Sequence, residues 1–425
     1  MHRQYVIACT PSLRMVYKCR CMEKPQTKKS AYRWVVLGVF TFAIALTQFL
    51  WLNFAPIETT VRQELGISVF QVGLLTSIFP ILSILLSAPV GTLLDAKGFR
   101  FTVSIGVIIM GVSVLLRLKY RSYAWLFAGQ FGISVAQPFV LNSVSKFASV
   151  WFDKDESVIA NGLGSMAMFV GMIAAMVITP LLVTGKGLGF ALSVYAGVTL
   201  LGSILFLLLG KNNPALSSSL REEEKEYKGT DAYRSILGMK DMILLIAIMF
   251  IGIGFFNGLM TWMAELLSQN GFTAVQTGTI GGVIIGGGIL GALVIPLLSD
   301  VMRRRKPFLI IATVVGGAIV YPFLNTGSIT TVIILGALIG FFVISLLPII
   351  LQMTTEIVGE RLTGTATGLL MLIGSVGAVV VIYLMEWIKN VTGSFHNALW
   401  LMMVFFAAAL VLSILIRETH PDRGT

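Results

Sequence analysis

Twelve long apolar stretches constrain this chain more than any other feature of its sequence. A membrane-spanning helix needs roughly 20 mostly apolar residues, whereas the strands of a membrane barrel alternate with a period of two. The stretches here are continuous, and only 12% of all residues are charged, because charge is costly in hydrocarbon. The sequence therefore predicts an all-α membrane protein with twelve transmembrane helices. We place the spans near 34–57, 69–93, 101–118, 123–148, 158–183, 189–210, 241–267, 277–299, 307–325, 329–356, 364–388 and 396–416.

Two short loops indicate that the chain repeats itself. The first covers residues 91–100 and the second residues 296–306, and each lies between the second and third apolar span of its own half. Their aspartates, Asp95 and Asp300, are 205 residues apart in a chain of 425. An internal repeat of this kind in a membrane protein is typical of carriers whose halves move about a central site.

The repeat predicts two pseudo-symmetric bundles of six helices, at 33–210 and 241–417. The segment 211–240 between them is polar and of mixed charge, with Pro214 and several serines, which is typical of a linker on the cytoplasmic surface. Residues 1–32 and 418–425 are predicted to be cytoplasmic tails.

The distribution of basic residues predicts the topology. If the N-terminus lies in the cytoplasm, 25 of the 31 Lys and Arg residues fall on the cytoplasmic side and six fall outside. The six are Arg62, Arg117, Lys119, Arg121, Lys186 and Lys389. This bias predicts that both termini are cytoplasmic, in a protein of the plasma (inner) membrane. The net charge of +11 is then a sign of topology and not of nucleic-acid binding.

The eighth span is rich in glycine, with seven glycines between residues 278 and 291. Pairs four residues apart, such as Gly278 with Gly282 and Gly287 with Gly291, remove side chains from one face of a helix. We expect this span to approach its neighbours closely.

The first loop reads Gly-Thr-Leu-Leu-Asp-Ala-Lys-Gly-Phe-Arg over residues 91–100. This spacing resembles the loop between the second and third helices of the major facilitator superfamily, and the second loop is a degenerate copy. The resemblance covers residues 33–418. Ion pairs of such an aspartate with nearby bases bias the equilibrium between inward and outward states when they break and reform. We predict a cytoplasmic gate made by Gly91, Asp95, Lys97, Gly98, Arg100, Lys146, Asp300, Arg303 and Arg304.

A narrower resemblance rests on the stretches 134–139 and 146–156 in the fourth span and on residues 48–51 in the first. These are similar to the feline-leukaemia-virus-subgroup-C-receptor-related family, which transports choline, ethanolamine or haem-linked cargo. In that family a Trp, a Gln, a Tyr and a second Gln contact the cationic head of the ligand.

The resemblance places Trp51 and Gln137 at the first two of these four positions. The other two fall on Asn257 and Ser375, where the residue types depart from the family. The resemblance therefore implies a small ligand related to choline.

The spans hold few ionisable residues, with Glu58 and Glu265 in the outer parts of the first and seventh. A carrier of anions needs a buried cation, and no Arg lies at a predicted span centre. A Trp ring attracts a cation with about 0.5–2 kcal/mol. We predict a substrate site of Trp51, Gln137, Asn257, Phe256, Ser375, Gln48, Asn53 and Trp262. Helix packing or lipid contact is the competing interpretation of the aromatic residues, as is interhelical hydrogen bonding for Gln137.

These observations predict a monomeric facilitative or secondary carrier for a small organic cation, zwitterion or neutral polar solute, which works by alternating access. One alternative is a proton-coupled efflux antiporter of amphipathic compounds, with Glu265, or else Glu58, as the proton carrier. Another is a sensor or receptor that has the fold of a carrier without transport. We find no nucleophile–base constellation, metal-ligand spacing or phosphate loop, so we expect no enzyme, cofactor or metal site.

Overall fold

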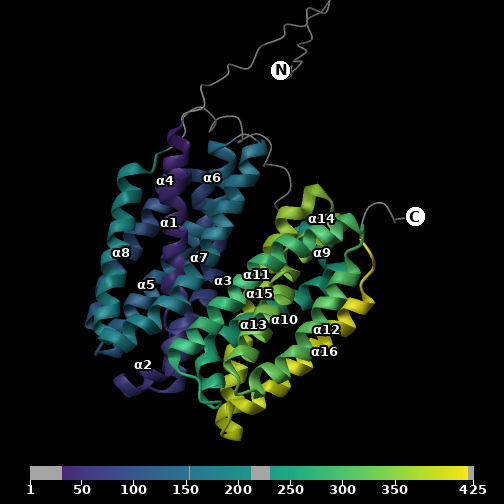
Figure 1. Ribbon diagram of the computed structural model, residues 1–425. Coiled ribbons are helices and arrows are strands. Elements are labelled where there is room, and N and C mark those ends of the chain that lie inside the picture. The colour runs from purple at the N-terminus through teal and green to yellow at the C-terminus, as the bar shows by residue number, and fades with distance from the viewer. Residues whose placement is uncertain (1–30, 153, 212–229, 420–425) are drawn as a thin grey trace, which may run out of the picture.

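The structure, a computed structural model, describes residues 31–152, 154–211 and 230–419, and all the regular elements within these ranges are helices (Figure 1). Eleven helices are long and apolar enough to cross a membrane, and a shorter apolar helix covers Trp400–Leu415. The predicted all-α membrane fold is confirmed. The predicted tails up to residue 30 and from residue 420, and residues 212–229 of the linker, lie outside the described residues.

The first half of the chain forms one bundle. Its elements are α1 (Tyr32–Leu52), η1 (Ala55–Ile57), α2 (Glu58–Leu65), α3 (Val69–Lys97), α4 (Phe99–Leu116), η2 (Arg117–Lys119), α5 (Tyr123–Leu141), α6 (Ser143–Trp151), α7 (Lys154–Lys186) and α8 (Leu188–Leu209).

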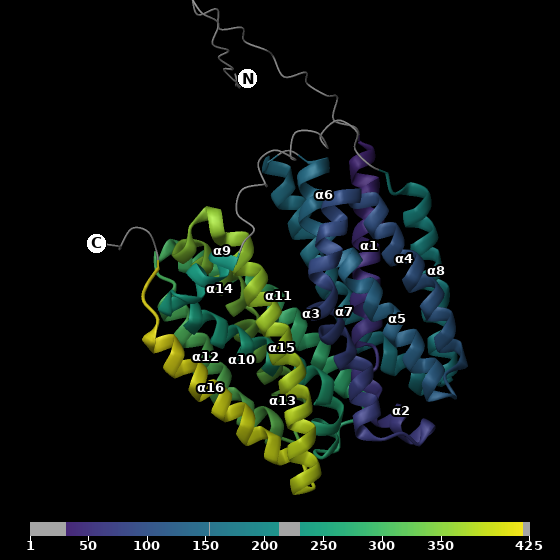
Figure 2. The same ribbon diagram turned by 180° about the vertical axis from the view of Figure 1, so that it is seen from behind.

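The second half forms a bundle beside the first (Figures 1 and 2). Its elements are α9 (Thr230–Leu237), α10 (Lys240–Ser268), α11 (Ala274–Val301), α12 (Lys306–Asn325), α13 (Ile329–Ile344), α14 (Leu346–Val358), α15 (Glu360–Thr392), η3 (Phe395–Asn397) and α16 (Ala398–Leu415).

Equivalent helices of the two bundles begin with the same local chemistry. At the start of α3 the Ser68 hydroxyl accepts from the backbone N–H of Gln71, whose side-chain oxygen accepts from the N–H of Ser68. Thr273 and Gln276 make the same capping box at the start of α11. Such a box satisfies two donors that a helix start leaves free. The boxes are 205 residues apart, the same offset as the two loops.

Two predicted spans are each divided in two. The fourth changes from α5 to α6 at Asn142, and the tenth changes from α13 to α14 at Ser345. Pro138 lies just before the first division and Pro348 just after the second. Proline has no N–H for the helical hydrogen bond, which weakens the helix locally.

The glycines of α11 allow the close approach that their spacing predicts. A Cβ at Gly278 would overlap the carbonyl oxygen of Met176 on α7, in the other bundle. A Cβ at Gly291 would overlap the carbonyl oxygen of Phe341 on α13, within its own bundle. The same glycine-rich helix thus joins the bundles through one part and builds the second bundle through another.

The two ends of the molecule differ. We call the end with α6 and α14 the terminal end, because both termini of the described chain lie there, and the end with α2 the distal end (Figures 1 and 2). The bundles meet where α11 packs on α7, α15 on α3, and η1 and α2 on α10. Toward the terminal end their helices diverge (Figure 2).

Candidate functional site

Trp51 lies at the end of α1 and is held against α3. Its indole N–H donates to the carbonyl of Thr76 at 3.2 Å, and its ring centroid is 6.5 Å from that of Phe79. Only 8% of the residue is exposed. The indole N–H is therefore already hydrogen-bonded inside the first bundle, and this bond fixes the orientation of the ring.

Gln137 contacts the same helix farther along. Its side-chain oxygen lies 3.5 Å from the hydroxyl of Ser83, which donates to it. Ser83 follows Thr76 by two helical turns, so both lie on one face of α3, about 10 Å apart along its axis. The structure thus brings Trp51 and Gln137, which are distant in sequence, onto one face of α3.

Gln48 and Asn53 are buried at the end of α1, within three residues of Trp51 in the sequence. The side-chain oxygen of Gln48 and both polar atoms of Asn53 have no hydrogen-bond partner in the part of the chain that the structure describes. Gln130, which the sequence did not single out, donates to the carbonyls of Leu50 and Leu75 at 3.1 and 3.0 Å. It ties α1 to α3 beside Trp51. A glutamine inside an apolar span is the signal that could have indicated it.

The polar residues that the sequence predicts for the substrate site in the second bundle form hydrogen bonds within their own helices. Asn257 donates to the carbonyl of Ile253 at 2.9 Å, and Ser375 donates to that of Met371 at 2.9 Å. Phe256 is half-buried. The substrate role of these three residues stays a prediction.

Trp262 lies fully buried between the bundles. Its N–H donates to the carbonyl of Ile382 at 3.0 Å, and its ring is so close to Gly73 of α3 that a Cβ there would lie 2.8 Å from it. Only a residue without a side chain leaves room for this ring. The contact closes the space between α3, α10 and α15.

Tyr383 on α15 is an inter-bundle residue that sequence reasoning missed. Its hydroxyl lies 2.8 Å from that of Ser77, and its ring centroid lies 5.6 Å from that of Phe70. Ser77 is the neighbour of Thr76, the residue that accepts from Trp51. Tyr383 follows Ser375 by about two turns, so the helical period of α15 could have indicated it.

Glu58 and Glu265 meet through a shared arginine at the distal end. The guanidinium of Arg62 on α2 lies 3.6 Å from the carboxylate of Glu58 and 3.4 Å from that of Glu265 on α10. Glu58 is buried, and Glu265 belongs to the other bundle. The two predicted proton carriers thus form one cluster that bridges the bundles.

The loop after α3 holds its aspartate at the surface. Asp95 pairs with Lys146 of α6 at 3.4 Å, and these side chains are 43% and 25% exposed. Gly98 begins α4 with a φ of 80°, which favours glycine. Lys97 and Arg100 are exposed on either side of it, and Gly91 is half-buried.

The loop after α11 is organised by Arg305, which was not predicted. This buried guanidinium pairs with Asp300 and, at 3.1 Å, with Glu356 of α14. Burial lowers the pKa of Arg305, but hydrogen bonds to Asp300 and Glu356 outweigh it and raise the pKa overall. Arg303 and Arg304, the predicted residues, are exposed. The run of three arginines at 303–305 indicated a basic loop, but the sequence did not show which arginine is buried.

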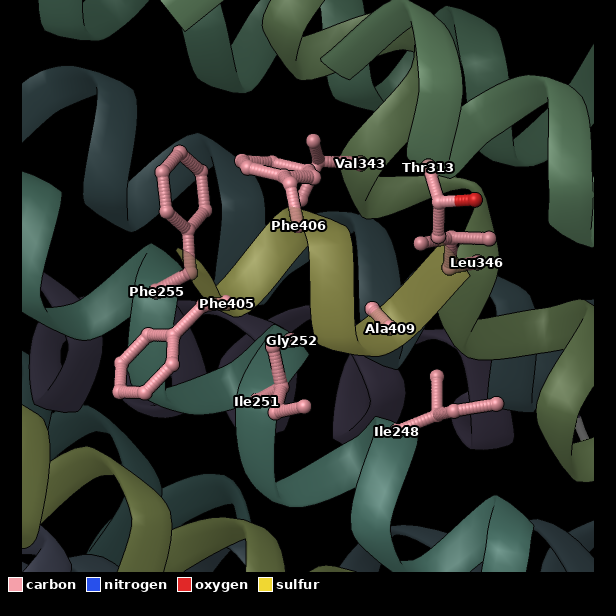
Figure 3. Close-up of a pocket in the computed structure, with 10 residues that line it drawn as sticks. All are labelled: Ile248, Ile251, Gly252, Phe255, Thr313, Val343, Leu346, Phe405, Phe406 and Ala409. Atoms are coloured by element: carbon pink, nitrogen blue, oxygen red, sulfur yellow. The ribbon is translucent and has the colours of Figure 1, made fainter. Parts of the chain in front are cut away.

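A small cavity of about 20 Å³ lies among helices of the second bundle, away from these groups (Figure 3). It is lined by Ile248, Ile251, Gly252, Phe255, Thr313, Val343, Leu346, Phe405, Phe406 and Ala409. The hydroxyl of Thr313 donates within its own helix, to Leu309 or Ile310. The cavity therefore offers an apolar lining and none of the predicted site residues.

Two repeated bundles of long apolar helices, packed against each other through α3, α7, α10, α11 and α15, define an integral membrane protein of the carrier class. A model of the Major Facilitator Superfamily matches residues 40–382 and again 285–425. The chain belongs to the Major Facilitator Superfamily, a superfamily of transporters.

Relatives support the narrower resemblance. The choline/ethanolamine transporter FLVCR2 of Homo sapiens is 27% identical over 83% of this chain and 71% of its own length. Solute carrier family 49 member A3 of Xenopus tropicalis is 26% identical over 67% of this chain, and the match spans 62% of that protein. These matches confirm the resemblance drawn from the first and fourth spans.

A solved structure has the same fold. It is a bacterial homolog of the human lysosomal transporter Spinster, in an inward-facing and unoccupied conformation. It matches with a TM-score of 0.76 and 16% identity, over 92% of this chain and 98% of that one.

Proposed function

We propose that this transporter carries a small organic cation, zwitterion or neutral polar solute by facilitative alternating access, as a monomer in the plasma membrane. The bias of basic residues supports a cytoplasmic position for the terminal end, with the N-terminal six-helix bundle at 33–210 and the second at 241–417. Because the bundles meet toward the distal end and diverge toward the terminal end, we assign the arrangement to a state open to the cytoplasm.

The observation that carries this proposal is the placement of Trp51 and Gln137 on one face of α3. A buried indole attracts an ammonium group through its ring, and an amide oxygen accepts from an ammonium or hydroxyl donor. Ser77 on the next position of α3 contacts Tyr383 from the other bundle. Ser77 lies about 100° around α3 from Thr76, so Tyr383 brings a group of the second bundle to the same level of α3, beside this face. We propose that alternating access uses groups from both bundles here.

The remaining residues take supporting roles in the proposed site. Gln48 and Asn53 retain unused hydrogen-bonding atoms, whereas Asn257 and Ser375 must exchange a backbone partner to bind a solute. Phe256 supplies apolar contact, and Trp262 closes the distal side. The name of the human relative, a choline/ethanolamine transporter, supports an ammonium-bearing solute.

The test uses the purified full-length protein with choline, ethanolamine, betaine and neutral osmolytes as probes. A ligand that binds the folded form raises the melting temperature. We expect at least one probe to do so and to enter proteoliposomes. Trp51→Ala and Gln137→Ala should lose both effects, and the exposed controls Trp400→Ala and Gln63→Ala should keep them. Unchanged shifts and uptake in both site variants would remove the proposed site.

The cluster of Glu58, Arg62 and Glu265 favours proton-coupled efflux as a second candidate. Two carboxylates share one guanidinium between the bundles, and a proton on one of them would relieve their mutual repulsion. Export driven by a pH gradient and abolished by Glu265→Gln would support this candidate. A transport rate that does not change with the pH gradient would exclude proton-coupled efflux. Binding of a probe without any flux would instead support the non-transporting sensor.

A further inference from the structure

Arg117 is the most unusual charged residue of the first bundle. The charge pattern of the sequence assigns it to an outer loop, yet it is 0% exposed, at the start of η2. Its aliphatic part packs on α5, where a Cβ at Gly129 would lie 2.6 Å from its Cγ. Its guanidinium carbon lies 4.7 Å from the centroid of the Phe54 ring. The fold thus encloses this side chain from several directions.

The charge of Arg117 lacks a protein partner among the described residues. None of its three guanidinium nitrogens has a hydrogen-bond acceptor. An arginine does not lose its proton in a protein, so the charge itself must be compensated. Removing an ion from water costs more than contact with one aromatic face returns. A counter-charge from outside the chain satisfies this requirement.

The groups near Arg117 are suited to an anion. Tyr195 of α8 is close enough to Arg117 for a charge on either group to affect the other, and Thr179 of α7 lies beside Tyr195. Both hydroxyls are buried, and apart from each other they have no hydrogen-bond partner among the described residues. Guanidinium and hydroxyl groups are donors, and a single positive charge is balanced by a single negative one.

We propose that Arg117, with the hydroxyls of Tyr195 and Thr179, binds a monovalent inorganic anion such as chloride near the distal end of the first bundle. The anion has a structural consequence. Phe54, under the guanidinium, precedes η1, and η1 packs on α10 and α11 of the other bundle. The bound anion fixes the turn between Trp51 and the inter-bundle contact, whichever solute the protein carries.

The experiment compares thermal unfolding of the purified full-length protein in sodium chloride and in sodium gluconate at equal ionic strength. The melting temperature should rise with chloride in a saturable manner. Arg62→Gln, which changes an arginine at the same end that has carboxylate partners, should keep this response. Arg117→Gln should lose it, and Tyr195→Phe should need more chloride. Equal melting temperatures in the two salts, or an unchanged chloride response in Arg117→Gln, would overturn the proposal.

A second measurement does not require the Arg117→Gln variant to fold. Bromide replaces chloride and scatters X-rays anomalously. Crystals of the unaltered protein in bromide should show an anomalous peak within hydrogen-bonding distance of the Arg117 guanidinium. Bromide at other positions only, or none, would contradict the site even if salts alter stability.

Discussion

The two repeat-related loops both expose their aspartates, Asp95 by 43% and Asp300 by 60%, but they pair them with bases in opposite surroundings. In the first, Asp95 pairs with Lys146 and the side chains are 43% and 25% exposed. In the second, Asp300 pairs with Arg305, whose side chain is 5% exposed and which also binds Glu356. An exposed pair forms and breaks at little cost, whereas breaking a buried network leaves a charge unpaired. We infer that the first loop supplies the changeable part of the proposed gate and the second a fixed part.

The segment after α16 strengthens this difference. The Glu418 carboxylate accepts from the backbone N–H groups of Arg305 and Lys306, at 2.7 and 3.3 Å, and so caps α12. The hydroxyl of Thr419 donates to Glu356 at 2.6 Å. The equivalent helix α4 begins at Gly98 with no side-chain cap. Residues 418–419 thus fasten the second loop.

The largest effect is expected for Arg305→Met. It leaves the buried Glu356 without its cation, which costs about 3–5 kcal/mol, so the melting temperature should fall steeply. The exposed Arg304→Met is the matched control and should stay within about 0.5 kcal/mol of the unaltered protein. Equal losses in the two variants would show that the second loop is no more fixed than the first.

A smaller loss is expected for Glu418→Gln. A neutral amide loses the attraction between a carboxylate and the start of α12, worth about 0.3–1 kcal/mol. Thermal unfolding should show this loss for Glu418→Gln and none for Glu64→Gln, which changes an exposed carboxylate at the distal end. No difference between the two variants would remove the capping role.

Asp95→Asn should alter transport more than stability. The loss of an exposed pair costs about 0.2–1 kcal/mol, but it falls on a contact that we propose to form and break in every cycle. We expect a small change in melting temperature and a clear change in the rate of solute exchange in proteoliposomes. The charge exchange Asp95→Lys with Lys146→Asp should restore part of the rate. A fall in stability as large as that of Arg305→Met would contradict the comparison.

The smallest effect is expected from salt. Raising the ionic strength from about 0.1 M to 1 M shortens the screening length from about 10 Å to 3 Å. The contribution of Asp95 and Lys146 should decline, and that of the buried Arg305 should remain. The difference in exchange rate between the unaltered protein and Asp95→Asn should therefore shrink at high salt. If high salt reduced the loss of stability caused by Arg305→Met to the same extent, the Arg305 network would behave as an exposed one.

The sequence determined the fold through local signals. The length and continuity of the apolar runs require helices in a membrane, and the offset between Asp95 and Asp300 reappears in the capping boxes at Ser68 and Thr273. The glycine spacing in α11 also predicted close packing, because the helical period places residues four apart on one face.

Only the tertiary structure decided which groups meet. The sequence singled out Trp51 and Gln137, but the rotation and neighbours of α3 place them on one face. The same holds for Tyr383 beside Ser77, for the burial of Arg305 beside exposed arginines, and for the enclosure of Arg117. A helix can rotate about its axis without changing its apolar content, so composition does not specify its partners. Contacts between helices that are distant in sequence fix that rotation, and with it the chemistry of the space between the bundles.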